Sequence, residues 1–221
     1  MKRKLTTISP IVQKCTKLPL DQKLVSKLCK FGVVLQEEDE EVQTTIIPIP
    51  PVISMESRLP RGFFNRHVVT VAKDLLGKTL NFGSFQGLIT ETEAYGGLDD
   101  EASHSYNGPT PRSAIMFGAP GYSYVYTIYG MYNCLNIVAD EVGTPSAVLI
   151  RGLKLQEVHL NGPGKLCKVL NITRLHSGIN LALDSNFYVS HGLKSVLYKS
   201  TPRIGIKKAV DKLWRFVMID V

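Results

Sequence analysis

The sequence predicts a single α+β domain: a curved, mostly antiparallel sheet with surrounding helices and a protruding β-hairpin that carries a tyrosine. Three observations lead to this prediction. Short runs of alternating apolar and polar residues recur between turn residues, as in antiparallel strands. One amphipathic helix precedes these runs, and a tyrosine-rich hairpin pattern follows them. A chain of 221 residues is long enough for one such domain with a full core, or for a domain plus an appendage.

Residues 1 to 54 differ in composition from the rest of the chain. They contain a lysine-rich start, an acidic run from Glu37 to Glu41 and the proline-rich stretch Ile47-Pro-Ile-Pro-Pro-Val52, which predicts an extended linker. We therefore expect an N-terminal extension over residues 1–54, partly disordered or linker-like, and a main domain over residues 55–221. Met55 directly follows the linker, so one hypothesis is that it is the functional start.

The charge of the chain favours a polyanionic partner. The formal net charge is +7, and most of it belongs to residues 55–221. No apolar run is long enough to span a bilayer and no signal-type apolar core follows the basic start, so we expect an intracellular protein, cytoplasmic in a prokaryote or nuclear in a eukaryote. The four cysteines lie far apart without a C-x-x-C pair, which indicates reduced thiols rather than disulfides or zinc ligands.

The first elements of the main domain are a helix and a hairpin. An apolar stripe from Val68 to Leu76 predicts a core-packing helix, with Asn65 as its N-cap and Gly77 at its C-terminal end. After the helix, Leu80–Phe82 and the pair Gly83-Ser84 predict a hairpin that leads into the next strand.

That next strand, Gly87–Ala94, is the most informative stretch of the sequence. Period-two alternation places Glu91, Glu93 and Tyr95 on one face. Acids have poor strand propensity and repel each other, so we interpret Glu91 or Glu93 as a working acid or base. The alternative is a solvated strand end with an incidental tyrosine. The irregular chain that follows, as far as Pro120, has a length typical of functional loops.

Residues Tyr122–Val138 predict the tyrosine hairpin. Tyr124 and Tyr126 alternate on one strand face, the turn lies at Tyr129-Gly130, and Cys134–Val138 returns as a strand. Aromatic residues at this spacing are core residues more often than ligand platforms. A tyrosine beside a glycine at an exposed tip instead fits a wedge inserted between bases.

The last part of the chain contains basic residues next to apolar elements. The apolar strand Ala147–Gly152 includes Arg151, which must find an anion or reach solvent. A helix is predicted over Leu166–Leu170. The amides at its start, together with Lys165, could hold a phosphate. The alternative is that these residues only begin a helix and bind no ligand. Arg203–Lys208 and Trp214–Val217 predict two short strands, the first edged with positive charge.

Nine short strings of residues carry a resemblance to a known family. In chain order they are Glu91-Thr-Glu-Ala-Tyr95, Asp100-Glu-Ala-Ser-His104, Thr110-Pro-Arg112, Met116-Phe117, Tyr124-Val-Tyr126, Ile128-Tyr-Gly-Met-Tyr132, Asn136-Ile137, Val148-Leu-Ile-Arg151 and Gly162-Pro-Gly-Lys-Leu166. Together they resemble the alkyladenine (3-methyladenine) DNA glycosylase family, also called methylpurine glycosylases. The resemblance covers roughly Leu59 to Val221.

The resemblance implies a base-excision repair enzyme for double-stranded DNA containing damaged purines. Such enzymes flip an alkylated or deaminated purine into a pocket and hydrolyse its N-glycosidic bond, leaving an abasic site. It implies a monofunctional hydrolase that acts as a monomer, without a cofactor, a metal or a membrane. No lysine near the motifs is placed for a Schiff base, and no histidines have metal-ligand spacing.

The resemblance also assigns roles to residues. Glu93 would position and deprotonate the attacking water, and Arg151 would help to orient that water and the target phosphate. Glu91 would be structural. The remaining assignments are Tyr95, His104, Tyr126 and Asn136 in the base pocket, Tyr129 as the intercalating residue, and Lys165 and Arg203 as contacts to the DNA backbone. Gly164 stands where a serine is common in relatives.

Two other functions remain open at this stage. One is a damaged-DNA-binding protein of the same fold without catalysis. The other is a metal-dependent nuclease whose ligands would be Glu91, Glu93, Asp99, Asp100 and Glu101. A zinc base deaminase is excluded because the H-x-E and P-C-x-x-C elements are missing from the sequence.

Overall fold

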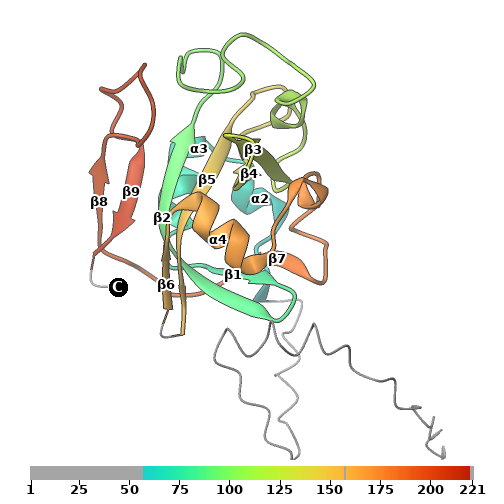
Figure 1. Cartoon of the computed structure of the whole chain (residues 1–221), viewed down its shortest axis with the longest axis vertical. Helices are drawn as coiled ribbons and strands as arrows, with labels where there is room; N and C mark the ends of the chain where they lie inside the picture. Colours follow the sequence, from blue (N-terminus) through green and yellow to red (C-terminus); the bar gives the residue numbers. More distant parts are fainter. Residues whose placement is uncertain (1–56, 157, 220–221) are drawn as a thin grey trace, which may run out of the picture. The chain divides into compact units, whose positions relative to one another are not determined.

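The strand that carries the two glutamates lies at the centre of a curved antiparallel sheet (Figure 1). The computed structural model describes residues 57–156 and 158–219, so the predictions for residues 1–54 and for Met55 lie outside the described residues. Within these ranges one sheet contains β1 (Thr79–Phe82), β2 (Phe85–Tyr95), β3 (Ser123–Ile128), β4 (Tyr132–Val138), β5 (Ala147–Leu155), β6 (Val158–Asn161), β7 (Phe187–Ser190), β8 (Tyr198–Thr201) and β9 (Arg215–Met218). The predicted α+β fold with a mostly antiparallel sheet is confirmed.

Strand β2 is the branch point of this sheet. The main strand order is β3-β4-β5-β2-β1-β7, and β9 also pairs with β2. Along one edge of β2, residues 85–88 pair with β1 and Glu91–Glu93 pair with β9; the other edge pairs with β5. The register against β5 shifts around Glu91, as in a β-bulge. Bulges often lie beside active sites because they re-aim a side chain.

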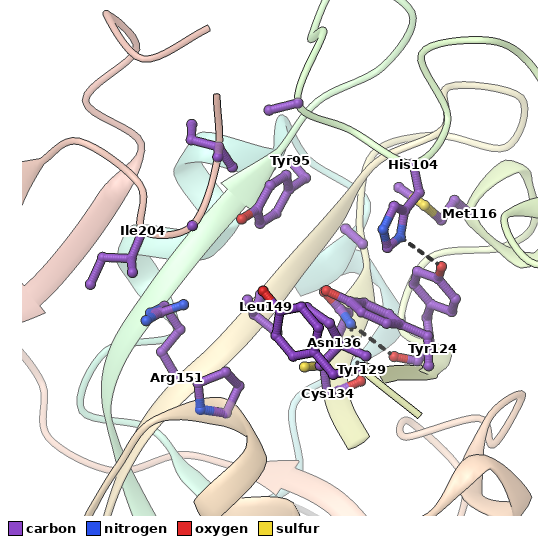
Figure 2. Close-up of a pocket in the computed structure, with 17 residues that line it drawn as sticks. Tyr95, His104, Met116, Tyr124, Tyr129, Cys134, Asn136, Leu149, Arg151 and Ile204 are labelled. Atoms are coloured by element: carbon purple, nitrogen blue, oxygen red, sulfur yellow. Dashed lines mark hydrogen bonds between the residues drawn. The ribbon is translucent and has the colours of Figure 1, made fainter. Parts of the chain in front are cut away.

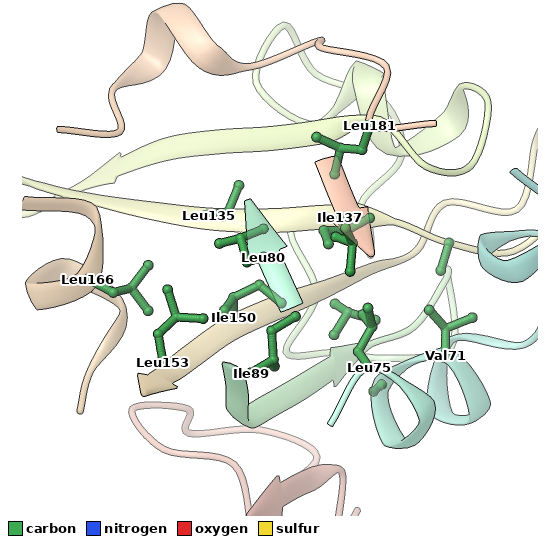
Figure 3. Packing of buried hydrophobic residues seen from close by; sticks show 14 of the residues in the cluster. Val71, Leu75, Leu80, Ile89, Leu135, Ile137, Ile150, Leu153, Leu166 and Leu181 are labelled. Carbon is green, nitrogen blue, oxygen red and sulfur yellow. The ribbon is translucent and has the colours of Figure 1, made fainter. Parts of the chain in front are cut away.

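Short helices pack against the sheet and complete the core. They are α2 (Arg61–Phe64), α3 (Val68–Asp74), α4 (Pro163–Leu170) and the 3-10 helices η2 (Ala114–Phe117) and η3 (Arg174–His176). Figure 3 shows Val71 of α3, Leu75 directly after that helix, Leu166 of α4, and Ile89 and Ile150 of the sheet within one apolar cluster. No helix in the described part of the chain is long and apolar enough to cross a membrane.

The helix start differs from the prediction. Asn65 does not cap α3; it ends α2, and α3 begins at Val68 after His67. The cap is long-range, because the Asp140 carboxylate accepts a hydrogen bond of 3.1 Å from the Val68 N–H. A carboxylate at a helix N-terminus satisfies a free amide and interacts favourably with the helix dipole. At the other end, Gly77 has φ 75°, the left-handed conformation expected after a helix.

The two predicted hairpins are present, but one predicted strand is not. Phe82 pairs with Phe85 across Gly83-Ser84. Strand β3 pairs with β4 from Ser123 opposite Ile137 to Ile128 opposite Tyr132. Helix α4 begins at Pro163, three residues before the predicted start. The predicted strand Arg203–Lys208 is wrong: these residues form a loop, and the strand that pairs with β9 is β8 (Tyr198–Thr201).

Candidate active site

A pocket with a volume of about 200 Å³ lies beside strands β2 to β5 and brings six of the predicted site residues together. These six are Tyr95, His104, Tyr126, Tyr129, Asn136 and Arg151. Figure 2 shows Arg151 and Ile204 on one side of the pocket, with His104 and Tyr124 on the other. The volume is below the range of about 300–1,000 Å³ that is typical of drug-sized ligands, so the pocket suits a small ligand.

Glu93 lies directly behind this pocket rather than on its surface. The residue is 0% exposed. Its Oε2 accepts hydrogen bonds from the Tyr95 hydroxyl at 2.8 Å and from Nη1 of Arg151 at 3.4 Å, and its Oε1 accepts one from the Ile204 N–H at 2.7 Å. All three donors belong to residues that line the pocket. Burial raises the pKa of Glu93, and these three donors oppose the rise.

Glu91 orders two arginines next to Glu93. Its Oε1 accepts a hydrogen bond of 2.9 Å from Nε of Arg151 and one of 2.6 Å from Nε of Arg215. Arg151 therefore bridges the two glutamates of β2. Burial alone would lower the pKa of Arg151, but the negative charges of Glu93 and Glu91 outweigh it and raise this pKa. The guanidinium is a permanent cation at the pocket wall.

The rings of His104, Tyr124 and Tyr126 form the pocket wall opposite Arg151. Nδ1 of His104 lies 3.0 Å from the Tyr124 hydroxyl, and the His104 ring meets the Tyr126 ring edge to face, with centroids 4.6 Å apart. Burial by these rings and the charge of Arg112 lower the pKa of His104 to about 4. His104 is therefore a neutral imidazole at physiological pH. Tyr124 is a pocket residue that was not predicted, although its alternation with Tyr126 places both on one strand face.

The side chain of Asn136 on β4 is fixed by hydrogen bonds to the backbone of the sheet. Its side-chain amide donates to the backbone carbonyls of Tyr124 at 3.1 Å and Cys134 at 3.3 Å. Asn136 pairs with Tyr124 across the hairpin, and the residue is 3% exposed. A side chain fixed in this way presents a constant hydrogen-bonding edge to the pocket.

Tyr129 occupies the turn between β3 and β4. The residue is 82% exposed, and its φ of 52° lies in the left-handed region that few residues other than glycine adopt. Gly130 follows with φ 69°, and the Met131 N–H closes the turn on the Ile128 carbonyl at 3.2 Å. An exposed aromatic ring on a strained backbone has no packing role of its own, so the observation points to function.

The two predicted backbone contacts have different surroundings. Lys165 is exposed in the first turn of α4, next to Pro163 at the pocket. Arg203 is buried: its side chain is 0% exposed and it binds both carboxylate oxygens of Asp100, at 2.6 and 2.7 Å. The side chain of Arg203 is thus enclosed and engaged by Asp100, which does not favour a contact to a DNA phosphate, and its assignment as a backbone contact stays a prediction.

The acids required by the nuclease hypothesis are held by cations. Glu91 is bonded to Arg151 and Arg215, and Asp100 to Arg203. Within residues 57–156 and 158–219, no group of three or more histidine, cysteine, aspartate or glutamate side chains is arranged to hold a metal ion. Carboxylates neutralised by arginines are poorly suited as ligands, which weakens the nuclease hypothesis.

Comparisons with known proteins identify the family. The family model described as methylpurine-DNA glycosylase matches residues 62–220. The chain is 55% identical over 161 residues to a protein of the Wolbachia endosymbiont of Brugia malayi, covering 72% of this chain and 95% of that protein. A protein of Ehrlichia ruminantium is 49% identical over 173 residues, covering 76% of this chain and 92% of that protein. Both relatives bear the name "Putative 3-methyladenine DNA glycosylase". The chain belongs to the methylpurine-DNA glycosylase family of DNA-repair enzymes.

Proposed function

We propose that this protein flips alkylated or deaminated purines out of duplex DNA and hydrolyses their N-glycosidic bond, leaving an abasic site. The observation that carries the proposal is the buried carboxylate of Glu93 behind an aromatic pocket, with Arg151 between it and the pocket. The protein acts as an intracellular monomer, without a metal or cofactor. Flipping is required because water cannot reach the bond to a base that is stacked in the duplex.

The rings of Tyr95, Tyr126 and His104 form the receptor for the extruded base. Alkylation at a ring nitrogen gives the purine a positive charge, and aromatic faces attract cations. His104 is neutral at physiological pH, so it does not repel such a base. Asn136, fixed against the sheet, contacts the base edge and rejects normal guanine.

Glu93 activates the attacking water. A carboxylate has about four acceptor positions and Tyr95, Arg151 and Ile204 use three of them, so Glu93 can also accept a hydrogen bond from a water. As the base leaves, the sugar acquires oxocarbenium character, which a nearby carboxylate stabilises. Arg151 orients the water and the phosphate of the target nucleotide.

Tyr129 fills the space left by the flipped nucleotide. Its exposure at the hairpin turn allows the ring to enter the minor groove and stack between neighbouring bases, as aromatic and apolar wedges of other DNA-bending proteins do. Lys165 contacts the DNA backbone beside the pocket.

The proposal is tested by excision of a single damaged purine from a labelled duplex in excess chelator, followed by alkali. We expect the wild type to leave an alkali-sensitive site. Glu93→Gln should bind the same duplex but excise at least about a hundredfold more slowly, the usual contribution of a general base.

Two other outcomes would reject the proposal. If the wild type binds lesion DNA tightly and releases no base, the protein is a damage-binding protein without catalysis. Cleavage that appears only after metal is restored indicates a nuclease instead.

A further inference from the structure

The loop after β8 forms part of the pocket wall although it belongs to no strand. Ile204, Gly205 and Ile206 line the pocket, and the Ile204 N–H donates the 2.7 Å hydrogen bond to Glu93. Figure 2 shows Ile204 on the same side of the pocket as Arg151. Because no ladder of backbone hydrogen bonds fixes this loop, its position must come from side chains.

Arg203, directly before Ile204, provides that anchor. Its guanidinium binds both oxygens of Asp100 and also donates to the Ala94 carbonyl at 2.9 Å. The same group lies 4.7 Å from the centre of the Tyr95 ring. Ala94 and Tyr95 are the two residues that follow Glu93 on β2, so one guanidinium contacts both of them and directly precedes Ile204, which bonds to Glu93.

Asp100 connects this anchor to the loop that leads to His104. It accepts hydrogen bonds from the N–H groups of Gly96 at 2.9 Å and Ala102 at 3.3 Å. Burial would raise the pKa of Asp100, but the bonds from Arg203 and Gly96 outweigh it and lower this pKa. The carboxylate is therefore ionised whenever the protein is folded near neutral pH.

We propose that the buried ion pair Arg203–Asp100 positions two groups for the reaction. It holds the Ile204 N–H within hydrogen-bonding distance of Glu93, and it fixes the orientation of the Tyr95 ring. The inference rests on the proposed role of Glu93. A fully buried ion pair contributes little net stability because its desolvation cost offsets its attraction. What it provides is a defined geometry, since bidentate arginine–carboxylate pairs tolerate little displacement.

The test uses Arg203→Lys and Asp100→Asn, with Glu101→Gln as a matched control. Lys208 and Glu101 form a salt bridge of 3.2 Å between the same two loops, but both side chains are about half exposed or more, at 62% and 49%. Three properties are measured for each variant: single-turnover excision against pH, the Kd for a lesion duplex, and thermal unfolding. Carbon-13 NMR of the Glu93 carboxyl group reports its pKa without requiring activity.

Both variants should excise about tenfold or more slowly at saturating enzyme, the size expected when a charged acceptor loses a hydrogen bond, with Kd changed less than about threefold. The Ile204 N–H lowers the pKa of Glu93, so its loss should move the acid limb of the rate profile to higher pH. Of the other groups facing Glu93, Arg151 and Glu91 do not contact the pair, and a displaced Tyr95 hydroxyl would raise the pKa of Glu93 in the same direction. Glu101→Gln should match the wild type.

Folded variants with a wild-type rate and a wild-type pH profile would overturn the inference. An unchanged Glu93 pKa in the NMR titration would do so even if the wild type proved inactive. Wild-type inactivity together with a shifted Glu93 pKa would reject the glycosylase proposal and leave the positioning role in place. If Arg203→Lys does not fold, Asp100→Asn decides alone, because its amide oxygen can still accept from Gly96 or Ala102.

Discussion

The hydroxyl of Tyr95 donates a 2.8 Å hydrogen bond to the carboxylate of Glu93, two residues earlier on the same strand. Residues i and i+2 of a strand share a face, so the aromatic ring of the base receptor and the proposed general base are coupled by the strand itself. A substitution of either side chain therefore removes or alters a hydrogen bond of the other.

Tyr95→Phe should separate stacking from this coupling. The ring remains, so affinity for a lesion duplex should change less than about threefold, while excision falls about tenfold because Glu93 loses a hydrogen bond that lowers its pKa. The acid limb of the rate profile should move to higher pH. Tyr188→Phe on β7 is the control, and equal losses in the two variants would contradict the coupling.

Tyr129→Gly and Tyr129→Ala should differ in stability but agree in function. Glycine accepts φ 52° without strain, so Tyr129→Gly should raise the free energy of unfolding by about 1 kcal/mol, whereas alanine keeps the strained backbone. Both lack the ring and should lose about tenfold in affinity for lesion DNA. Urea unfolding and fluorescence anisotropy measure the two effects. Full affinity in either variant would argue against the intercalating role.

Lys165→Gln should reduce the dependence of DNA binding on salt. One lost phosphate contact lowers the slope of log K against log salt by about 1. Lys154→Gln provides a control, because Lys154 is also exposed but lies on β5, whereas Lys165 is two residues from Pro163 at the pocket. Identical slopes for the wild type and Lys165→Gln would remove Lys165 from the interface.

His104 should titrate near pH 4 in an NMR experiment, well below the ordinary histidine value of about 6.5. A folded-state pKa below the unfolded value means that the stability contribution is complete above about pH 6.5 and is lost as the pH falls toward 4. Arg112→Gln removes the second cause of the shift and should raise the pKa. A His104 pKa near 6.5 would contradict the assignment of a neutral ring.

Glu91→Gln should lower the free energy of unfolding by about 2 kcal/mol, because it leaves Arg151 and Arg215 without their shared carboxylate in a largely buried site. Asp74→Asn disrupts the exposed pair with Arg66 and should cost less than about 0.5 kcal/mol. Urea denaturation of both variants gives the comparison. Equal losses would mean that Glu91 has no special structural role.

Strands β2 to β5 were predictable from sequence because their signals are local. Alternation at Glu91, Glu93 and Tyr95 needs only neighbouring residues, and it predicted that these side chains share one face of the strand, where the structure shows the Tyr95 hydroxyl bonded to Glu93. Gly83-Ser84 identified a two-residue hairpin for the same reason.

The features that sequence reasoning missed depend on residues far apart in the chain. The cap of α3 comes from Asp140, 72 residues after Val68. From the sequence, Arg203 was expected to be an exposed basic residue. In the structure it is buried and bonded to Asp100, 103 residues earlier. An isolated basic side chain gives no local sign of a buried partner.

The sheet branch at β2 affects the order in which the fold forms. Glu91 meets Arg215 across 124 residues, and Glu93 meets Ile204 across 111 residues. Contacts between residues so far apart cost loop-closure entropy before they contribute any stability, so we expect them to form late in folding. Until residues 204–218 have joined β2, Glu91 lacks Arg215 and Glu93 lacks the Ile204 N–H, so the surroundings of the two glutamates are the last part of the sheet to be completed.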